Sequence, residues 1–188
     1  MQNTLLDLSE LRFLTVDDSA EMRSLITNML FSLGAHNFLD ANDGGGALEI
    51  MSVNHIDVVH TDWMMTPIDG LELTRHIRTA PDSRYQTIPI IMISGYTEAH
   101  HVAQARNAGV TEFLAKPVSP ISLYHRIEEV ILRPRKFIRT DSYTGPDRHR
   151  HNDDAYFGPR RRGGDDVGQE AANESCAAAA SAQNSGEA

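Results

Sequence analysis

The chain has 188 residues, a hydrophobic fraction of 40% and a single cysteine, Cys176. This length suits one ordinary domain plus an appendage, and one cysteine excludes an internal disulfide framework and a multi-cysteine metal site. No apolar run is long enough to cross a bilayer, and the N-terminal residues lack a signal-peptide pattern. We therefore expect a cytoplasmic protein without membrane insertion.

Charge divides the chain into three parts. Residues 1–132 carry 8 basic and 17 acidic residues, residues 133–162 carry 9 and 4, and residues 163–188 carry 0 and 5. The corresponding net charges are -9, +5 and -5. A basic arm thus joins an acidic domain to an acidic tail.

Composition supplies the expected boundaries. We expect a lead over residues 1–10, a domain over 11–132, a basic arm rich in proline, glycine and arginine over 133–166, and a low-complexity, alanine-rich tail over 167–188. The arm and the tail lack core-forming residues, which predicts that both are disordered in isolation.

Within the domain, short strand-like apolar runs alternate with longer helical patterns, which predicts an α/β fold with a doubly wound five-stranded parallel sheet. The first pair is a strand over 11–16 and a helix over 20–33, with Ser19 as N-cap and Gly34 as the C-terminal stop. The other predicted strands span 36–40, 56–61, 88–93 and 112–115, and the other helices span 46–52, 71–78, 98–107 and 120–132.

Three carboxylates stand at predicted strand ends. Asp17 and Asp18 close the first strand, and Asp62 ends the third. Ligands collect at this edge of such sheets, and three carboxylates there would repel one another unless a hard cation such as Mg2+ lay among them. Singly, Asp18 could cap a helix and Asp62 could begin a turn, but the set of three favours a metal site.

A hydroxyl and an ammonium follow the last two strands. Ser94 comes after the fourth strand, and Lys116 with Pro117 comes after the fifth. These groups could bind the oxygens of a phosphoryl group on Asp62. Each dipeptide alone is also a common turn signal, but their position after consecutive strands favours a phosphoryl site.

Residues 11–131 resemble the CheY-type receiver domain of response regulators, which has the flavodoxin-like (βα)5 fold. The resemblance covers about two thirds of the chain. It rests on five motifs in order: LTVDDS at 14–19, ANDGGGAL at 41–48, HTDWMMTPIDG at 60–70, MISG at 92–95 and AGVTEFLAKP at 108–117.

The resemblance implies a phosphorelay protein that takes its phosphoryl group on Asp62 from a histidine kinase or a phosphotransfer protein. It implies Mg2+ as the cofactor, held by Asp17, Asp18, Asp62 and the backbone carbonyl of Met64. Such a domain catalyses only its own phosphorylation and dephosphorylation, so it is not an enzyme in the usual sense.

The resemblance also assigns the groups around the phosphoryl group. Lys116 would contact it, Ser94 would move towards it, and Phe113 would be the aromatic side chain whose rotamer reports the change. The peptide bond between Lys116 and Pro117 is expected to be cis.

Two further features concern the loops beside Asp62. Family members usually have proline four residues after the acceptor, whereas this chain has Thr66 there, followed by Pro67. Met64 and Tyr96 are bulky and flank the site, so we expect them to hinder the attacking water and to prolong the life of the phosphoaspartate.

Other chemistry is less favoured. A haloacid-dehalogenase-like phosphatase would need a second acid where the chain has Met64. His100, His101, His149 and His151 are not at a convincing metal spacing, and we treat them as solvated.

The arm contains an internal repeat, YTGPDRHR at 143–150 and YFGPRRRG at 156–163. It resembles the arginine-rich C-terminal extensions of CheY-like proteins that bind cyclic di-GMP, since arginines suit phosphates and purine faces and aspartates suit a guanine edge. The nucleotide-binding candidates are Arg148, Arg150, Asp153, Arg161, Arg162 and Asp165. A solubilising or protein-docking tail is the alternative. DNA binding is disfavoured by the acidic flanking regions.

Three functions stay open at this level. The leading one is a stand-alone switch that acts on a downstream protein by contact, because residues after 132 contain neither a helix-turn-helix pattern nor a catalytic motif. The second is a dual-input switch whose arm binds cyclic di-GMP. The third is a phosphotransfer intermediate or phosphate sink.

Overall fold

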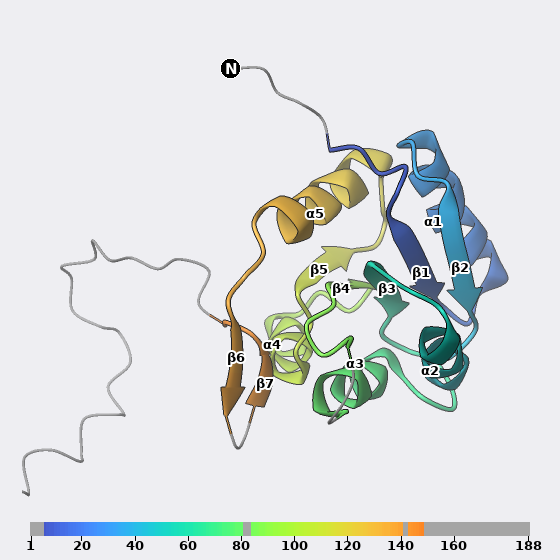
Figure 1. Cartoon of the computed structure of the whole chain (residues 1–188). Coiled ribbons are helices and arrows are strands. Elements are labelled where there is room, and N and C mark those ends of the chain that lie inside the picture. Colours follow the sequence, from blue (N-terminus) through green and yellow to red (C-terminus); the bar gives the residue numbers. More distant parts are fainter. Residues whose placement is uncertain (1–5, 81–83, 141–142, 149–188) are drawn as a thin grey trace, which may run out of the picture. The chain divides into compact units, whose positions relative to one another are not determined.

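The structure is a computed structural model that describes residues 6–80, 84–140 and 143–148. Its centre is a parallel five-stranded sheet with the order β2-β1-β3-β4-β5 (Figure 1). The strands are β1 (Arg12–Val16), β2 (Asn37–Ala41), β3 (Val58–Asp62), β4 (Ile90–Ser94) and β5 (Glu112–Ala115). The predicted doubly wound α/β fold is confirmed. None of the described helices is long and apolar enough to span a membrane.

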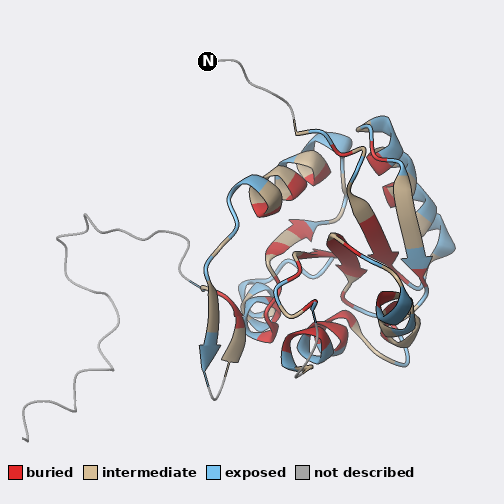
Figure 2. Cartoon of the chain, in the orientation of Figure 1, coloured by how far each residue is buried: buried red, intermediate tan, exposed pale blue. Residues whose placement is uncertain are grey.

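Five helices follow the five strands and cover both faces of the sheet. Apolar residues of α1 and α5 pack on one face, and those of α2, α3 and α4 pack on the other, so that buried positions lie on the sheet and the inner sides of the helices (Figure 2). The helices are α1 (Ala20–Ser32), α2 (Gly44–Val53), α3 (Gly70–Thr79), α4 (Ala99–Ala108) and α5 (Pro120–Leu132).

Local capping explains several helix boundaries. Ser19 caps α1 as predicted, since its hydroxyl accepts a hydrogen bond from the Met22 backbone N–H at 3.2 Å, and Gly34 follows that helix with a φ of +92°. The predicted start of the second helix is two residues late. The Asp43 carboxylate accepts from the N–H groups of Gly45 and Gly46 and so starts α2 earlier.

Residues 137–140 and 143–146 contradict the prediction of disorder from residue 133 onwards. Here β6 (Phe137–Thr140) and β7 (Tyr143–Pro146) pair as an antiparallel hairpin. The hairpin contacts the receiver-like body closely, because a Cβ atom added to Gly145 would lie 3.0 Å from the Cα of Gly109. The predicted disorder of the later arm and the tail concerns residues 149–188, which lie outside the described part of the chain.

A buried cation explains why this short hairpin is ordered. Arg78 of α3 is 1% exposed, and its guanidinium donates to the carbonyls of Gly109 at 3.0 Å and Gln86 at 2.9 Å. The ring of Phe137 lies 5.3 Å from the guanidinium carbon. A buried charge is costly unless polar or aromatic groups surround it, and here these groups come from different elements. The Arg78 guanidinium therefore links α3 to the α4–β5 turn and to the hairpin.

His60 lies in the middle of β3, fully buried and stacked on Phe13 with ring centroids 5.7 Å apart. Within the described residues, neither of its ring nitrogens has a hydrogen-bond partner. Burial therefore lowers the pKa of His60 to about 4 from its ordinary value of 6.5.

This lowered pKa predicts acid sensitivity. Between pH 6.5 and about 4 the unfolded chain binds a proton at His60 that the folded chain does not, so stability falls by about 3 kcal/mol as pH drops through this window. His60→Leu should remove this component and stabilise the protein at neutral pH by roughly 1–3 kcal/mol. Denaturant unfolding at several pH values measures both effects, with His125→Leu on the exposed side of α5 as control. Parallel stability curves for His60→Leu and the unmodified chain would contradict the prediction.

Candidate functional site

The carboxyl edge of the sheet brings two of the predicted acids to one lysine. Asp17 follows β1 and Asp62 ends β3, and these strands are neighbours in parallel register. The Lys116 ammonium, after β5, lies 2.7 Å from Asp62 Oδ1 and 3.3 Å from Asp17 Oδ2. These contacts bring Asp17, Asp62 and Lys116 together at this edge. Asp18 is exposed beside them.

Burial changes the pKa values of the charged groups in this cluster because it removes them from water. Desolvation raises the pKa of Asp17, and the nearby charge of Asp62 adds to this, although the Ser19 N–H and Lys116 oppose it. Desolvation alone would lower the pKa of Lys116, but its hydrogen bond and attraction to Asp62, together with Asp17, outweigh this and raise it. The lysine therefore stays charged, and the buried carboxylates favour a positive partner.

This donor set fits a hard cation. Asp17, Asp18 and Asp62 offer carboxylate oxygens, and the Met64 backbone N–H donates to Asp62 Oδ2 at 2.9 Å, which brings the Met64 peptide beside the Asp62 carboxylate. Among the described residues no three acidic, histidine or cysteine side chains already stand together as a metal site. Asp17 and Asp62 instead both form ion pairs with the Lys116 ammonium, which supplies the positive charge between the two carboxylates.

Neighbouring groups fix the two loops that carry the acids. The Arg23 guanidinium donates to the Asp17 carbonyl at 2.8 Å and pairs with Asp40 at 2.8 Å, which ties α1 and β2 to the loop after β1. Gly70 begins α3 so close to β3 that a Cβ atom there would lie 1.9 Å from the Asp62 carbonyl oxygen. Only glycine permits this approach, which positions the loop after Asp62.

The other predicted site residues come from β4 and β5. Ser94 ends β4, is buried, and accepts a hydrogen bond from the Tyr96 backbone N–H at 3.1 Å. Phe113 of β5 is partly buried and packs against an apolar cluster that includes Trp63, the residue after Asp62. The Lys116–Pro117 peptide is cis, as expected, and Thr66–Pro67 is a second cis peptide.

The sequence interpretation missed some contributors to the site. Arg23 donates to the backbone carbonyl of Asp17, and its position one helical turn after the N-cap Ser19 was the available signal. His101 was treated as solvated, but its ring lies 5.2 Å from those of Trp63 and Tyr96. Its position three residues after Glu98, with which it forms an ion pair at 2.8 Å, was a weak indication of a structural role.

In the arm, only Arg148 of the nucleotide-binding candidates is described. Its guanidinium carbon lies 3.9 Å from the Tyr143 ring centroid. A cavity of about 330 Å³ is lined by Arg148 and by three other arginines, Arg106, Arg126 and Arg135. Arg126 and Arg135 both pair with the buried Glu112 at the start of β5. Arg150, Asp153, Arg161, Arg162 and Asp165 lie outside the described residues.

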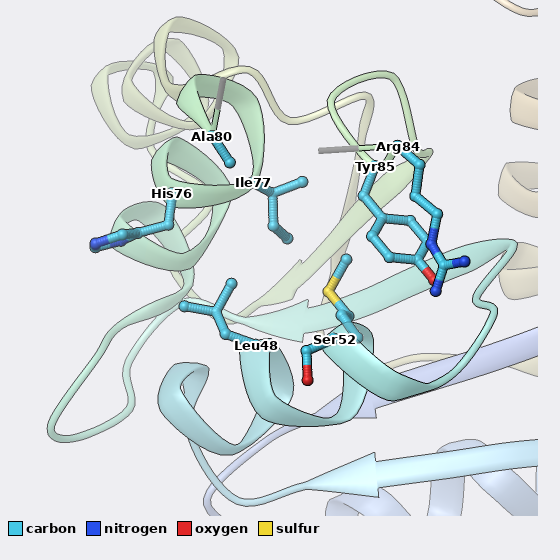
Figure 3. A pocket seen from close by; sticks show the side chains of 8 residues that line it. Leu48, Ser52, His76, Ile77, Ala80, Arg84 and Tyr85 are labelled. Carbon is cyan, nitrogen blue, oxygen red and sulfur yellow. The ribbon is translucent and has the colours of Figure 1, made fainter. Parts of the chain in front are cut away.

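A second cavity, of about 460 Å³, lies between α2 and α3 (Figure 3). Leu48 and Ile77 form its apolar sides, whereas the His76 side chain points away from it and the Arg84 guanidinium lies over the Tyr85 ring at 4.8 Å. None of the predicted acidic, lysine or serine residues of the site lines this cavity. The predicted site residues therefore lie apart from this cavity, at the carboxyl ends of the strands.

Comparison with known proteins agrees with this geometry. The family model of the response regulator receiver domain matches residues 13–128. The chain belongs to the receiver family. The match covers Asp17, Asp62, Lys116 and all of the parallel sheet except Arg12, and it makes this chain a CheY-like receiver of two-component signalling.

The matched region spans almost the full length of each of two relatives. A chemotaxis protein CheY homolog of Campylobacter jejuni is 35% identical over 122 residues, or 64% of this chain and 92% of the relative. Chemotaxis protein CheY1 of Helicobacter pylori is 38% identical over 122 residues, or 64% and 97%. These alignments leave about a third of the chain unmatched.

Solved structures show the same receiver fold. CheY4 of Vibrio cholerae superimposes with a TM-score of 0.60 at 28% identity, covering 64% of this chain and 98% of that one. A CheX–CheY–BeF3–Mg2+ complex from Borrelia burgdorferi matches with a TM-score of 0.58 at 25% identity, covering 64% and 88%. The solved structures of similar receivers thus include one with BeF3 and Mg2+.

Proposed function

We propose that Asp62 accepts a phosphoryl group from a phosphohistidine of a histidine kinase or a phosphotransfer protein. The observation that carries this proposal is the Lys116 ammonium, which lies 2.7 Å from Asp62 and 3.3 Å from Asp17 at the open carboxyl edge of the sheet. A charged donor fixed at this place is suited to the oxygens of an incoming phosphoryl group.

Asp62, Lys116 and Ser94 each have a separate role in the proposed phosphoryl transfer. An Asp62 oxygen attacks phosphorus as the bond from phosphorus to the histidine nitrogen breaks, so the imidazole is the leaving group. Lys116 moves from the carboxylate to a phosphoryl oxygen, and the Ser94 hydroxyl donates to another. Asp17, Asp18 and Asp62, with the Met64 carbonyl, would hold Mg2+, which supplies further positive charge to the phosphoryl oxygens. The protein modifies only itself.

The test uses acetyl phosphate as a small phosphoryl donor, with Mg2+ present and intact mass as the readout. The unmodified chain should gain one phosphoryl group, and Asp62→Asn should gain none. Glu49→Gln, which changes an exposed acid of α2, serves as the control and should behave like the unmodified chain. Equal labelling of Asp62→Asn and the unmodified chain would refute the proposal.

Two exposed side chains beside the acceptor should set the lifetime of the phosphoaspartate. Met64 is 55% exposed and Tyr96 is 45% exposed, so each can obstruct the path of an attacking water. We predict that Met64→Ala and Tyr96→Ala each accelerate hydrolysis by about two- to tenfold, the range expected when a contact of about 1 kcal/mol is lost. Release of inorganic phosphate from the purified phosphoprotein measures the rate. Unchanged decay in both variants would contradict this role.

For the output, we propose contact with a downstream protein in the cytoplasm, where a kinase and Mg2+ are available. The alternative, a phosphotransfer intermediate or sink, needs only the chemistry of Asp62. Partner titration with and without beryllofluoride separates the two, because a switch binds its target differently in the two states whereas a sink has no such target.

A second candidate function is binding of cyclic di-GMP by the arm. The specific observation is the cavity that Arg148 lines together with Arg106, Arg126 and Arg135, in a domain that is otherwise acidic. Guanidinium groups suit both the phosphates and the purine faces of such a ligand.

Calorimetric titration of cyclic di-GMP tests this candidate. Arg148→Ala and Arg161→Ala should weaken binding by about tenfold or more if each loses a charge-assisted hydrogen bond. Arg133→Ala, with a side chain that is 76% exposed, is the matched control. Absence of heat with the unmodified chain would leave phosphorylation as the single input.

A further inference from the structure

Three aromatic rings form a cluster beside the acceptor, hereafter the Trp63–Tyr96–His101 cluster. The His101 ring lies 5.2 Å from the Trp63 ring in an edge-on arrangement and 5.2 Å from the Tyr96 ring. Trp63 and Tyr96 are 6.5 Å apart. Trp63 is the residue after Asp62, so the cluster joins the acceptor loop to the loop between β4 and α4.

His101 is the link that holds this cluster to α4. The Glu98 side chain makes no N-cap hydrogen bond to α4 and instead pairs with His101 Nδ1 at 2.8 Å. The β4–α4 loop, residues 95–98, is exposed, and only Ala105 and Ala108 are buried in α4. The first turn of this helix therefore depends on the His101 contacts more than on capping or core packing.

Tyr96 has a backbone that is fixed beside Ser94 and a side chain that is partly free in solvent. Its backbone N–H donates to the buried Ser94 hydroxyl at 3.1 Å, but its side chain is 45% exposed. The Tyr96 ring lies against the rings of Trp63 and His101. Aromatic pairs at such separations contribute enough to bias an exposed side chain towards one position.

We infer that His101 is a positioning residue that holds the Tyr96 ring beside Trp63 and thereby slows the access of water to phosphorylated Asp62. This inference rests on the proposed function. In the hydrolysis, a water oxygen attacks phosphorus, the bond from phosphorus to the Asp62 oxygen breaks, and inorganic phosphate and the free carboxylate are released. The proton of the water leaves with the phosphate and solvent, and His101 takes no part in its transfer.

The test is the lifetime of the phosphoaspartate in the full chain, measured by phosphate release after labelling with acetyl phosphate and Mg2+. His101→Ala should decay roughly fivefold faster, the change in population that follows the loss of an aromatic contact. His101→Phe keeps a ring at this place and should restore the lifetime to within about twofold. His125→Ala on α5 is the control and should decay like the unmodified chain.

A double variant distinguishes positioning from a general loss of stability. If His101 acts through Tyr96, the His101→Ala and Tyr96→Ala double variant should decay no faster than Tyr96→Ala alone, whereas independent effects would multiply. The emission of Trp63, the single tryptophan of the chain, should also shift to longer wavelength in His101→Ala.

A lifetime of His101→Ala equal to that of the unmodified chain would overturn the inference, as would multiplicative effects in the double variant. Failure of the unmodified chain to become phosphorylated at all would instead overturn the proposed function beneath it. The two failures are distinguishable because the first leaves labelling of Asp62 intact.

Discussion

Lys116→Met is expected to be phosphorylated roughly a hundredfold or more slowly than the unmodified chain, the usual effect of removing one fixed donor from a developing charge. The ammonium is the group that touches both Asp62 and Asp17, and its raised pKa keeps it charged at neutral pH. Methionine preserves the length of the side chain but donates no hydrogen bond. The initial rate of labelling by acetyl phosphate is the measurement.

The control is Lys136→Met, which changes the chain's other lysine at an exposed position. It should label at the rate of the unmodified chain. A rate for Lys116→Met within about threefold of that of the unmodified chain would show that this ammonium is not a catalytic residue, because a loss of even 1.4 kcal/mol is tenfold.

Arg78→Met should lower the free energy of unfolding by about 2–4 kcal/mol. The change removes a guanidinium that is 1% exposed and takes away the hydrogen bonds that it donates to the carbonyls of the buried Gly109 and the half-buried Gln86. Burial lowers the pKa of Arg78 to about 10, so the group is still charged at neutral pH and is held by these carbonyls and by the Phe137 ring. Chemical denaturation at pH 7 measures the loss.

Arg75→Met, an exposed change on the same helix, should cost less than about 0.5 kcal/mol and is the matched control. A chain that ends at residue 132 should lose stability comparably to Arg78→Met, because it lacks Phe137 and β7 and exposes the guanidinium. A chain that ends at residue 148 keeps both strands and should be as stable as the full chain. Equal stability of the two shortened chains would contradict the role of the hairpin.

The receiver was predictable because its signals are local. Strands such as β4 are short apolar runs, and residues such as Ser19 and Gly34 mark helix ends within one turn of the chain. Parallel strands place their carboxyl ends at one edge of the sheet, so acids after β1 and β3 must approach one another whatever the details of packing.

The hairpin and the Trp63–Tyr96–His101 cluster were not predictable in this way. The hairpin is stabilised by Arg78 and Gly109, which lie far from it in the sequence, whereas its own composition is that of a disordered arm. His101 is polar and lies among polar residues of α4, so its sequence environment resembles that of a solvated residue. Its ring contacts Trp63 only because β3 and β4 are neighbours in the sheet.

The sequence by itself determined the five-stranded α/β fold, the order of its elements and the placement of Asp17, Asp62 and Lys116 at strand ends, since periodicity, capping and strand ends are local or follow from parallel topology. Only the tertiary structure decided that the Lys116 ammonium lies between Asp17 and Asp62 and that Arg23 donates to the backbone of the loop after β1. It also decided that β6 and β7 pair as a hairpin beside the buried Arg78. The physical reason is that the energies of buried charges and ring contacts depend on neighbours that the chain brings together only on folding.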